Sequence, residues 1–318
     1  MSRTRLVGIA AIAVTSVLWG TTGTAATFAP AAGPLAIGAA ALGAGGLLQA
    51  AAAAPALRAA WPSLRAQGRV VAWGAVSVGV YPLAFYSSMR AAGVAVGTVV
   101  SLASAPLVSG LLERFAERRP LSRSWMLAAA LGVAGSVLLC ASRMSGPESS
   151  AIGILAGIGL GLVAGATYAA YSWAASRLMR SGVDRAAAMG AVFGGGGALL
   201  VPVLLLTGAP LVESPRAFLV AGYMALIPMF CGYLLFGIGL ARVPASTATT
   251  VTLLEPAIAA ILAVAVVGER LTSLAGIGLA VIAGALLVLT VLPAGTSHPA
   301  DRAAETPPSR GLPPPDVA

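Results

Sequence analysis

Two stretches of this chain follow the same layout: AAGVAVGTVVSLASAPLVSGLLERFAERRPLSRSWMLAAALGVAGSVLL (residues 91–139) and ARVPASTATTVTLLEPAIAAILAVAVVGERLTSLAGIGLAVIAGALLVL (residues 241–289). Each contains an apolar segment with a proline near its middle, a short turn with arginine, and a second apolar segment. They align without a gap, and the matched positions include Ala91 with Ala241, Pro106 with Pro256, Leu121 with Leu271, Ser122 with Thr272 and Leu139 with Leu289. Because internal repeats of apolar segments are typical of secondary transporters, we expect a chain built from two copies of one membrane unit.

The composition is that of a membrane protein. Hydrophobic residues make up 58% of the chain and charged residues only 9%, whereas globular domains have about 25% charged residues. Apolar runs long enough to cross a bilayer as a helix lie at 6–28, 34–54, 70–89, 94–113, 124–142, 152–175, 186–207, 217–240, 245–266 and 273–292. The sequence therefore predicts an all-α, polytopic membrane protein of ten transmembrane helices. Residues 6–142 form the first five-helix repeat and residues 152–292 the second.

The arginines predict the orientation. The chain has no lysine, and with the N-terminus (1–5) in the cytoplasm, fifteen of the 19 arginines lie on the cytoplasmic side. This is the bias that the positive-inside rule describes, and five helices per half then make the second repeat inverted. We expect a multi-pass protein of the inner (cytoplasmic) membrane with both termini in the cytoplasm, ending in a disordered, proline-rich tail at 294–318.

Charge and reactive residues exclude several classes of function. The net charge of +9 follows from the topology, so we expect no nucleic-acid partner. The single histidine, His298, lies in the tail, and Cys140 and Cys231 lie inside predicted spans, so we expect no metal site and no cofactor. The predicted spans show neither paired carboxylates nor a serine or cysteine beside a recognisable base, which argues against an enzyme.

Short motifs in both halves resemble a known family. Trp19-Gly20 in the first span, Ala105-Pro106 in the fourth, and Leu254-Glu255-Pro256 followed by Gly268-Glu269-Arg270-Leu271 are similar to the EamA family of the drug/metabolite transporter superfamily. The first half departs from the pattern at its turn, which reads Glu117-Arg118-Arg119-Pro120-Leu121. The resemblance implies a ten-helix carrier that exports amino acids or other small metabolites and runs on an ion gradient.

Glu255 is the candidate coupling residue. It falls about ten residues into the ninth span, or about 15 Å along a helix, near the middle of the bilayer, and no other acid is expected to be buried as deeply. A charge there costs at least roughly 2.5–3.5 kcal/mol, and no arginine is expected at that depth, so burial should keep the carboxyl protonated at rest. A carboxyl that holds either a proton or an ammonium group would couple proton entry to cation exit. Alternatively, Glu255 only repairs the helix where Pro256 lacks an N–H and leaves the Thr252 carbonyl unpaired, and both roles fit the sequence.

Aromatic side chains at similar depth are candidates for the substrate pathway. The predicted binding residues are Glu255, Thr252, Trp19, Tyr81, Phe85, Tyr168 and Tyr233. Packing or interfacial anchoring is the alternative for each ring, and we expect one or two rings to line the pathway. Pro106 and Pro256 are predicted helix breaks, and Glu113 and Glu269, at predicted span ends, are expected to be solvated turn charges.

Two glycine patterns predict close helix packing. Gly153, Gly157, Gly161 and Gly165 form a ridge on the sixth span, which we expect to be a packing seam within the monomer, although a dimer contact also fits. The run at 194–197 in the seventh span predicts either a segment that bends during transport or tight packing.

These features together predict a secondary active transporter. We expect it to export a small metabolite, such as an amino acid, an amine or a drug-like compound, by alternating access in a lipid bilayer, with proton coupling through Glu255. Alternatives are a uniporter or importer that follows the substrate gradient and, in another class, a membrane-embedded enzyme or a scaffold without transport. Both a monomer and a homodimer fit the sequence.

Overall fold

The computed structural model describes residues 3–26, 28–92, 94–118, 120–141, 151–262, 265 and 272–291. Every regular element in these ranges is a helix, as the sequence predicts. The Gly268-Glu269-Arg270-Leu271 motif and the tail at 294–318 lie outside the described residues, so the predictions made for them stay predictions.

The helices follow the predicted apolar segments closely. Those of the first half are α1 (Arg3–Gly20), α2 (Thr22–Ala26), α3 (Pro34–Gly38), the π-helix η1 (Ala39–Ala44), α4 (Gly45–Ala52), α5 (Ala54–Ala59), α6 (Trp61–Ala66), α7 (Gly68–Ala92), α8 (Val94–Ala116) and α9 (Arg123–Ala141). Those of the second half are α10 (Ala151–Arg180), α11 (Arg185–Thr207), α12 (Ala209–Val212), α13 (Pro215–Met224), the π-helix η2 (Ala225–Cys231), α14 (Gly232–Leu240), α15 (Ala245–Val251), α16 (Leu254–Leu262) and α17 (Ser273–Val291).

Most of the long helices are apolar enough to cross a membrane. Among the described residues, seven segments meet this condition, including α1 with α2, the run from α3 to α4 and the run from α13 to α14. α9 and α17 are also apolar, whereas the ninth predicted span is divided into α15 and α16. The protein is therefore an all-α polytopic membrane protein, and the number of ten spans stays a prediction.

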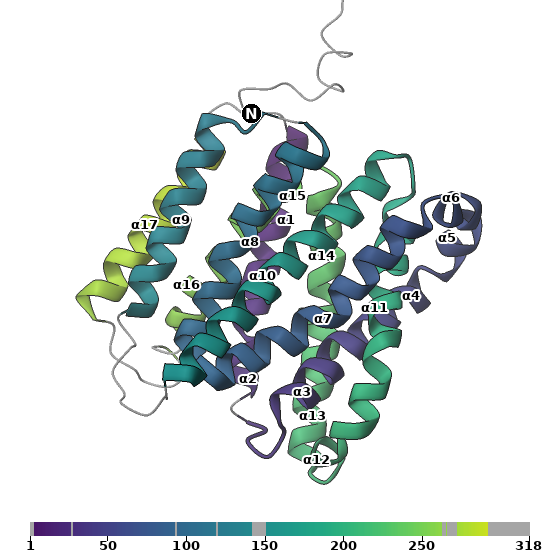
Figure 1. Cartoon of the computed structure of the whole chain (residues 1–318), viewed down its shortest axis with the longest axis horizontal. Coiled ribbons are helices and arrows are strands. Elements are labelled where there is room, and N and C mark those ends of the chain that lie inside the picture. Colours follow the sequence, from purple (N-terminus) through teal and green to yellow (C-terminus); the bar gives the residue numbers. More distant parts are fainter. Residues whose placement is uncertain are drawn as a thin grey trace, which may run out of the picture.

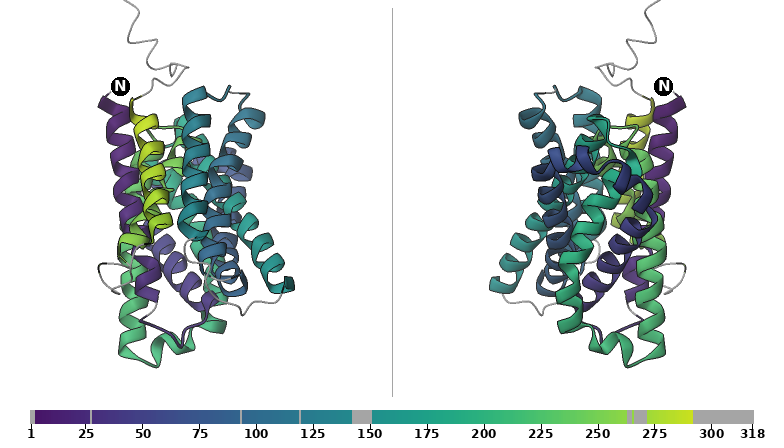
Figure 2. Two further views of the ribbon diagram at one scale, coloured as in Figure 1. Left: turned by 90° about the vertical axis from the view of Figure 1, so that its left-hand side faces the viewer. Right: turned by 90° about the vertical axis from the view of Figure 1, so that its right-hand side faces the viewer.

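The helix contacts pair the two halves of the chain. α9 packs along α17, α8 against α15, and α4 against α11, so that corresponding segments of the two halves touch. α1, in the first span of the first half, packs against α14, in the third span of the second half. α7, in the third span of the first half, packs against α10, in the first span of the second half, so the two contacts are equivalent. In Figure 1, α9 and α17 form one edge of the bundle, while α4, α5, α6 and α11 lie at the other. Figure 2 shows that the short helix α12 lies at the end of the bundle opposite the N-terminus.

The matched residues Ser122 and Thr272 perform the same structural task. The Ser122 hydroxyl accepts a hydrogen bond from the N–H of Trp125, 3.2 Å away, at the start of α9. The Thr272 hydroxyl accepts one from the N–H of Ala275, also 3.2 Å away, at the start of α17. Each side chain thus caps a free N–H group of the final helix in its half.

The glycine ridge of α10 packs inside the protein. A Cβ atom at Gly157 would meet Ala92 of α7, and one at Gly161 would meet Val100 of α8 at 3.0 Å. The hydroxyl of Ser88, in α7, also donates a hydrogen bond to the Gly157 carbonyl over 2.7 Å. The predicted seam within the monomer is confirmed at these glycines, which are covered by their own chain.

The glycine run at 194–197 packs tightly within a continuous α11. A Cβ atom at Gly195 would lie 2.8 Å from Ala75 of α7, and one at Gly197 would lie 2.7 Å from the Gly43 carbonyl oxygen of η1. The helix is continuous through the run, and these glycines bring α11 close to helices on two sides. Bending during transport stays a prediction.

Pro106 does not break its helix, which corrects that prediction. α8 runs without interruption through Pro106, as α7 does through Pro82 and α11 through Pro202. A proline removes one helical hydrogen bond, and packing against neighbouring helices can hold a membrane helix together at that point. α8 is packed against α7, α9, α10 and α15, which supplies such support.

Glu113 is buried, which also corrects a prediction. Its exposed fraction is 4%, so the side chain is enclosed by the protein and is not solvated as expected. The carboxyl oxygens of Glu113 accept hydrogen bonds from the Ser246 N–H at 3.0 Å and from the Ser246 hydroxyl at 2.6 Å. Ser246 lies in the first turn of α15, where N–H groups have no partner within the helix, so Glu113 caps α15 from α8. The sequence shows that Glu113 is near the end of a span but not that another helix begins against it.

Candidate functional site

An interruption in the ninth predicted span organises the site. α15 and α16 are separated by Thr252 and Leu253. Pro256 follows in the first turn of α16, a position at which a missing N–H removes no helical bond. Pro256 has no N–H to donate to the Thr252 carbonyl. This carbonyl instead accepts a hydrogen bond from the N–H of Glu255 at 2.9 Å, so it has a backbone partner.

The Thr252 side chain completes the end of α15. Its hydroxyl donates a hydrogen bond to the Thr249 carbonyl at 2.9 Å and accepts one from the Tyr168 hydroxyl at 2.8 Å. Thr252 and Tyr168 each expose only 1% of their surface. The carbonyl and hydroxyl groups of Thr252 are therefore satisfied by backbone and hydroxyl groups, without the Glu255 carboxyl.

Glu255 faces a small central cavity. Within the described ranges, no hydrogen bond or ion pair reaches its carboxyl, although the residue is only 9% exposed. The cavity has a volume of about 20 Å³, which holds one water-sized molecule. A buried carboxyl without a protein partner is costly, so its position calls for a proton, a water molecule or a cation at this point.

The walls of the cavity come from both halves of the chain. Trp19 of α1 and Tyr81 and Phe85 of α7 belong to the first half, and Tyr233 of α14 and Glu255 of α16 belong to the second. The remaining lining residues are Thr22, Gly38, Ala41, Leu42, Pro82, Tyr86 and Met229. The cavity therefore lies where the two halves meet.

Aromatic rings enclose the cavity in a continuous cluster. The Trp19 ring lies 4.7 Å from the Tyr233 ring and 6.1 Å from the Tyr168 ring, measured between centroids. Tyr81 stacks on Phe85 at 5.6 Å and approaches Tyr168 at 5.7 Å. Ring faces carry partial negative charge, so a site walled by rings beside a carboxyl is suited to an ammonium group.

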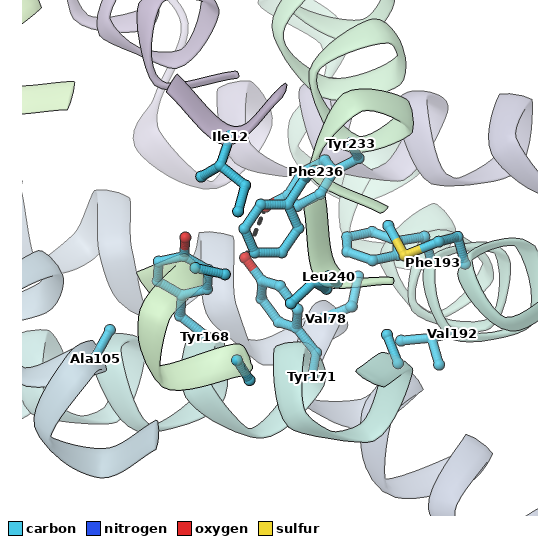
Figure 3. Close-up of a cluster of buried hydrophobic side chains, with 14 of the residues drawn as sticks. Ile12, Val78, Ala105, Tyr168, Tyr171, Val192, Phe193, Tyr233, Phe236 and Leu240 are labelled. Carbon is cyan, nitrogen blue, oxygen red and sulfur yellow. Dashed lines mark hydrogen bonds between the residues drawn. The ribbon is translucent and has the colours of Figure 1, made fainter. Parts of the chain in front are cut away.

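Two contacts outside the cavity hold Tyr233 in place. The hydroxyl groups of Tyr171 and Tyr233 share a hydrogen bond of 2.7 Å, and Figure 3 shows it joining α10 to α14. Figure 3 also shows Phe193 and Phe236 beside this pair, and the Phe193 ring lies 4.2 Å from the Tyr233 ring. The orientation of Tyr233 is therefore set by a polar contact and by ring packing.

Trp19 is held by the π-helix η2. Its indole N–H donates a hydrogen bond to the Pro228 carbonyl at 2.9 Å, and the Thr15 hydroxyl, one turn earlier in α1, bonds the Gly232 carbonyl at 3.1 Å. A π-helix widens the turn and is frequent at functional sites, and here it sets carbonyl groups against α1. Met229, also in η2, lines the cavity.

The structure brings all the predicted binding residues together. Trp19, Tyr81, Phe85, Tyr233 and Glu255 line the cavity. Tyr168 is not among the residues that line the cavity, but its ring contacts the rings of Trp19 and Tyr81. Its hydroxyl group donates a hydrogen bond to Thr252. More rings line the cavity than the one or two expected, and the part of each residue in binding stays a prediction.

Sequence reasoning missed other members of the cluster. Phe236 follows Tyr233 by about one helical turn, and this spacing could have identified it. Tyr86 lines the cavity because α3 approaches α7 at Gly38, where a Cβ atom would lie 2.9 Å from the Tyr86 ring. The sequence contains no signal for that approach.

The fold and the site define a multi-pass membrane protein with a central cavity between its two halves. Residues 155–291 match the EamA-like transporter family, over the stretch that the sequence assigns to the second repeat. The chain is 34% identical over 289 residues to the uncharacterized transporter YwfM of Bacillus subtilis (strain 168), and the match covers 89% of this chain and 93% of that relative. A solved crystal structure of a protein that is 22% identical has the same fold, with a TM-score of 0.73 over 96% of this chain and all of the other.

The chain belongs to the EamA-like transporter family. It is a membrane transporter, and its relatives point to transport rather than to an enzymatic reaction. A transporter of this kind binds a small-molecule substrate within the membrane.

Proposed function

We propose that this transporter is a secondary active carrier that exports a small metabolite with an amino group by alternating access, in exchange for protons held by Glu255. The substrate class comprises amino acids, amines and drug-like amines. The observation that carries the proposal is the Glu255 carboxyl, which lines a ring-walled cavity without a protein partner among the described residues. A proton or an ammonium group can each neutralise this carboxyl, and exchange of one for the other couples their movements.

Local repair of the helix does not account for Glu255. The Thr252 carbonyl bonds the backbone of Glu255, and the Thr252 hydroxyl bonds Thr249 and Tyr168. Among the described residues, the Glu255 carboxyl is not the partner of any of these groups. An acid in this place costs several kcal/mol unless a proton or a ligand neutralises it, which favours a role in transport.

The small volume of the cavity supports an alternating-access mechanism. A cavity of about 20 Å³ encloses a water-sized molecule, whereas ligand sites span about 300–1,000 Å³. The substrate therefore requires a second arrangement of the surrounding helices. Glu255, two residues after the interruption at Thr252 and Leu253, and Met229 of the π-helix η2 both line the cavity. The interruption and the π-helix are points at which a helix can change direction with few broken bonds.

The topology belongs to the same proposal. We infer two inverted five-helix repeats from the exchange of equivalent contacts, α1 with α14 and α7 with α10, and from the matched caps at Ser122 and Thr272. The inner membrane and cytoplasmic termini follow from the arginine bias. In support, the N-terminus and the arginine-bearing helices α5 and α6 lie toward the same end of the bundle in Figure 1.

Comparative metabolite profiling tests the export function. Cells that express the wild-type chain, the Glu255→Gln variant or an empty vector are matched for membrane expression, and medium and cytoplasm are profiled. We expect an amino compound to accumulate in the medium only with the wild type. Glu213→Gln is the matched control, because Glu213 is an exposed acid outside the cavity.

The same experiment separates this proposal from its alternatives. Accumulation that persists in Glu255→Gln cells and resists an uncoupler would identify a carrier that follows the substrate gradient. Accumulation in the cytoplasm instead of the medium would identify an importer. Either result would overturn the proposal of proton-coupled export.

A further inference from the structure

A large apolar groove lies on the outside of the bundle, away from the central cavity. It is formed where α4, α7 and α11 meet the short helices α5 and α6, and its volume is about 780 Å³. Its floor consists of small residues, among them Ala50 of α4 and Gly190 and Gly194 of α11. These residues lack large side chains because α4 and α11 approach each other closely, and a Cβ atom at Gly190 would lie 2.6 Å from that of Ala53.

Two arginines supply positive charge to the groove where it meets α5 and α6. Arg58 of α5 and Arg65 of α6 line the groove and are exposed, and neither has a hydrogen-bond or ion-pair partner among the residues that the structure describes. The chain contains no acid before Glu113. Asp184, at the start of α11, is engaged with the N–H groups of Ala186 and Ala187, which it caps at 2.8 and 3.2 Å.

Trp61 marks the same part of the groove as a membrane interface. Trp61 lies between Arg58 and Arg65 in the sequence. Its side chain lines the groove and is 62% exposed. Exposed tryptophan is favoured at the level of the lipid headgroups, where the ring contacts hydrocarbon and the N–H contacts water. α5 and α6 are anchored by Leu64, which is 4% exposed, so the arginines are presented from a fixed support.

We propose that this groove is a binding site for an anionic phospholipid. The phosphate lies against Arg58 and Arg65, and an acyl chain lies along the small residues of α4, α7 and α11. Any lipid would cover the apolar floor, but two guanidinium groups without acidic partners select a lipid whose headgroup has a net negative charge. The shape of the groove and the charge where it meets α5 and α6 therefore specify the same ligand class.

The test measures lipid binding to the full-length protein in a zwitterionic detergent. Native mass spectrometry counts bound dioleoylphosphatidylglycerol and dioleoylphosphatidylcholine, and the melting temperature is recorded with each lipid. We expect preferential retention of phosphatidylglycerol and a rise in melting temperature with that lipid alone. The double variant Arg58→Gln/Arg65→Gln is expected to bind it about 30-fold more weakly, as the loss of two surface arginine contacts implies.

Two further variants distinguish the groove from general charge effects. Arg114→Gln/Arg123→Gln removes two other exposed arginines and should bind phosphatidylglycerol like the wild type. Ala72→Phe fills the groove from an exposed position and should weaken binding while both arginines remain. Equal retention of the two lipids, normal binding by Arg58→Gln/Arg65→Gln, or equal losses in both arginine double variants would overturn the proposal. So would a melting shift of the same size with inorganic phosphate in place of the lipid.

Discussion

The contact between Glu113 and Ser246 gives a prediction about how the two halves are held together. Glu113 belongs to α8 and Ser246 to α15, and both hydrogen bonds between them are buried. Replacement of Glu113 by glutamine keeps the shape but leaves only one carbonyl oxygen to accept a bond. When the amide oxygen accepts from the Ser246 N–H, the amide NH2 faces the Ser246 hydroxyl, which must then accept instead of donate. The short bond that this hydroxyl donates to the carboxyl group is therefore replaced by a weaker contact.

The magnitude follows from the geometry of the contact. Hydrogen bonds between membrane helices contribute about 0.6 kcal/mol on average and about 1.7 kcal/mol at most. Glu113 accepts two bonds at once, and the 2.6 Å distance to the Ser246 hydroxyl is short for an O–H donor. We therefore expect Glu113→Gln to lower the free energy of unfolding by about 1.5 kcal/mol, roughly a 10-fold change in the unfolding equilibrium.

A double-mutant cycle measures the contact directly. Glu113→Gln, Ser246→Ala and the double variant are unfolded by titration of sodium dodecyl sulfate into mixed micelles, with tryptophan fluorescence as the signal. Because Ser246→Ala removes only the hydroxyl bond, the expected coupling energy is smaller, about 1 kcal/mol. Glu213→Gln is the control, since Glu213 is an exposed acid far from this contact in the chain and its replacement should change stability little. Additivity of the two single changes within about 0.3 kcal/mol would show that Glu113 and Ser246 do not stabilise each other.

Two other changes test the packing around the site. Trp19→Phe keeps a ring but removes the indole N–H that bonds the Pro228 carbonyl, so we expect a loss of stability of about 1 kcal/mol, measured by the same unfolding titration. An unchanged midpoint would show that η2 does not depend on this bond. Gly197→Ala places a Cβ atom 2.7 Å from the Gly43 carbonyl oxygen and should cost about 1–3 kcal/mol, whereas Gly159→Ala, with nothing within 4 Å, should leave the melting temperature unchanged or raise it. Equal behaviour of the two glycine variants would argue against the close approach of η1 and α11.

The fold was largely predictable because a bilayer restricts what a chain can form. Helices are required wherever an apolar segment crosses the membrane, so hydropathy alone located the long helices. Local chemistry added detail, since Ser122 and Thr272 precede their helices as capping residues do. Pro106 shows the limit of local rules, because its neighbours in space hold α8 together where the sequence predicts a break.

The site was predictable only in part, and the reason is spatial. Glu255 stood out because an acid far from a span end is rare and costly. Glu113 was misjudged because its burial depends on α15, which follows it by more than a hundred residues in the chain. The pairing of Tyr171 with Tyr233 depends on the crossing of α10 and α14, and no spacing in the sequence encodes that crossing.

Proton flux in proteoliposomes shows whether Glu255 exchanges a proton for the substrate. Purified protein is reconstituted with a pH-sensitive dye inside the vesicles, and the compound identified by metabolite profiling is added outside without a membrane potential. We expect substrate-driven proton movement with the wild type and with Glu213→Gln, and none with Glu255→Gln at equal reconstitution. Substrate-driven proton movement by Glu255→Gln at the wild-type rate would contradict this role of Glu255.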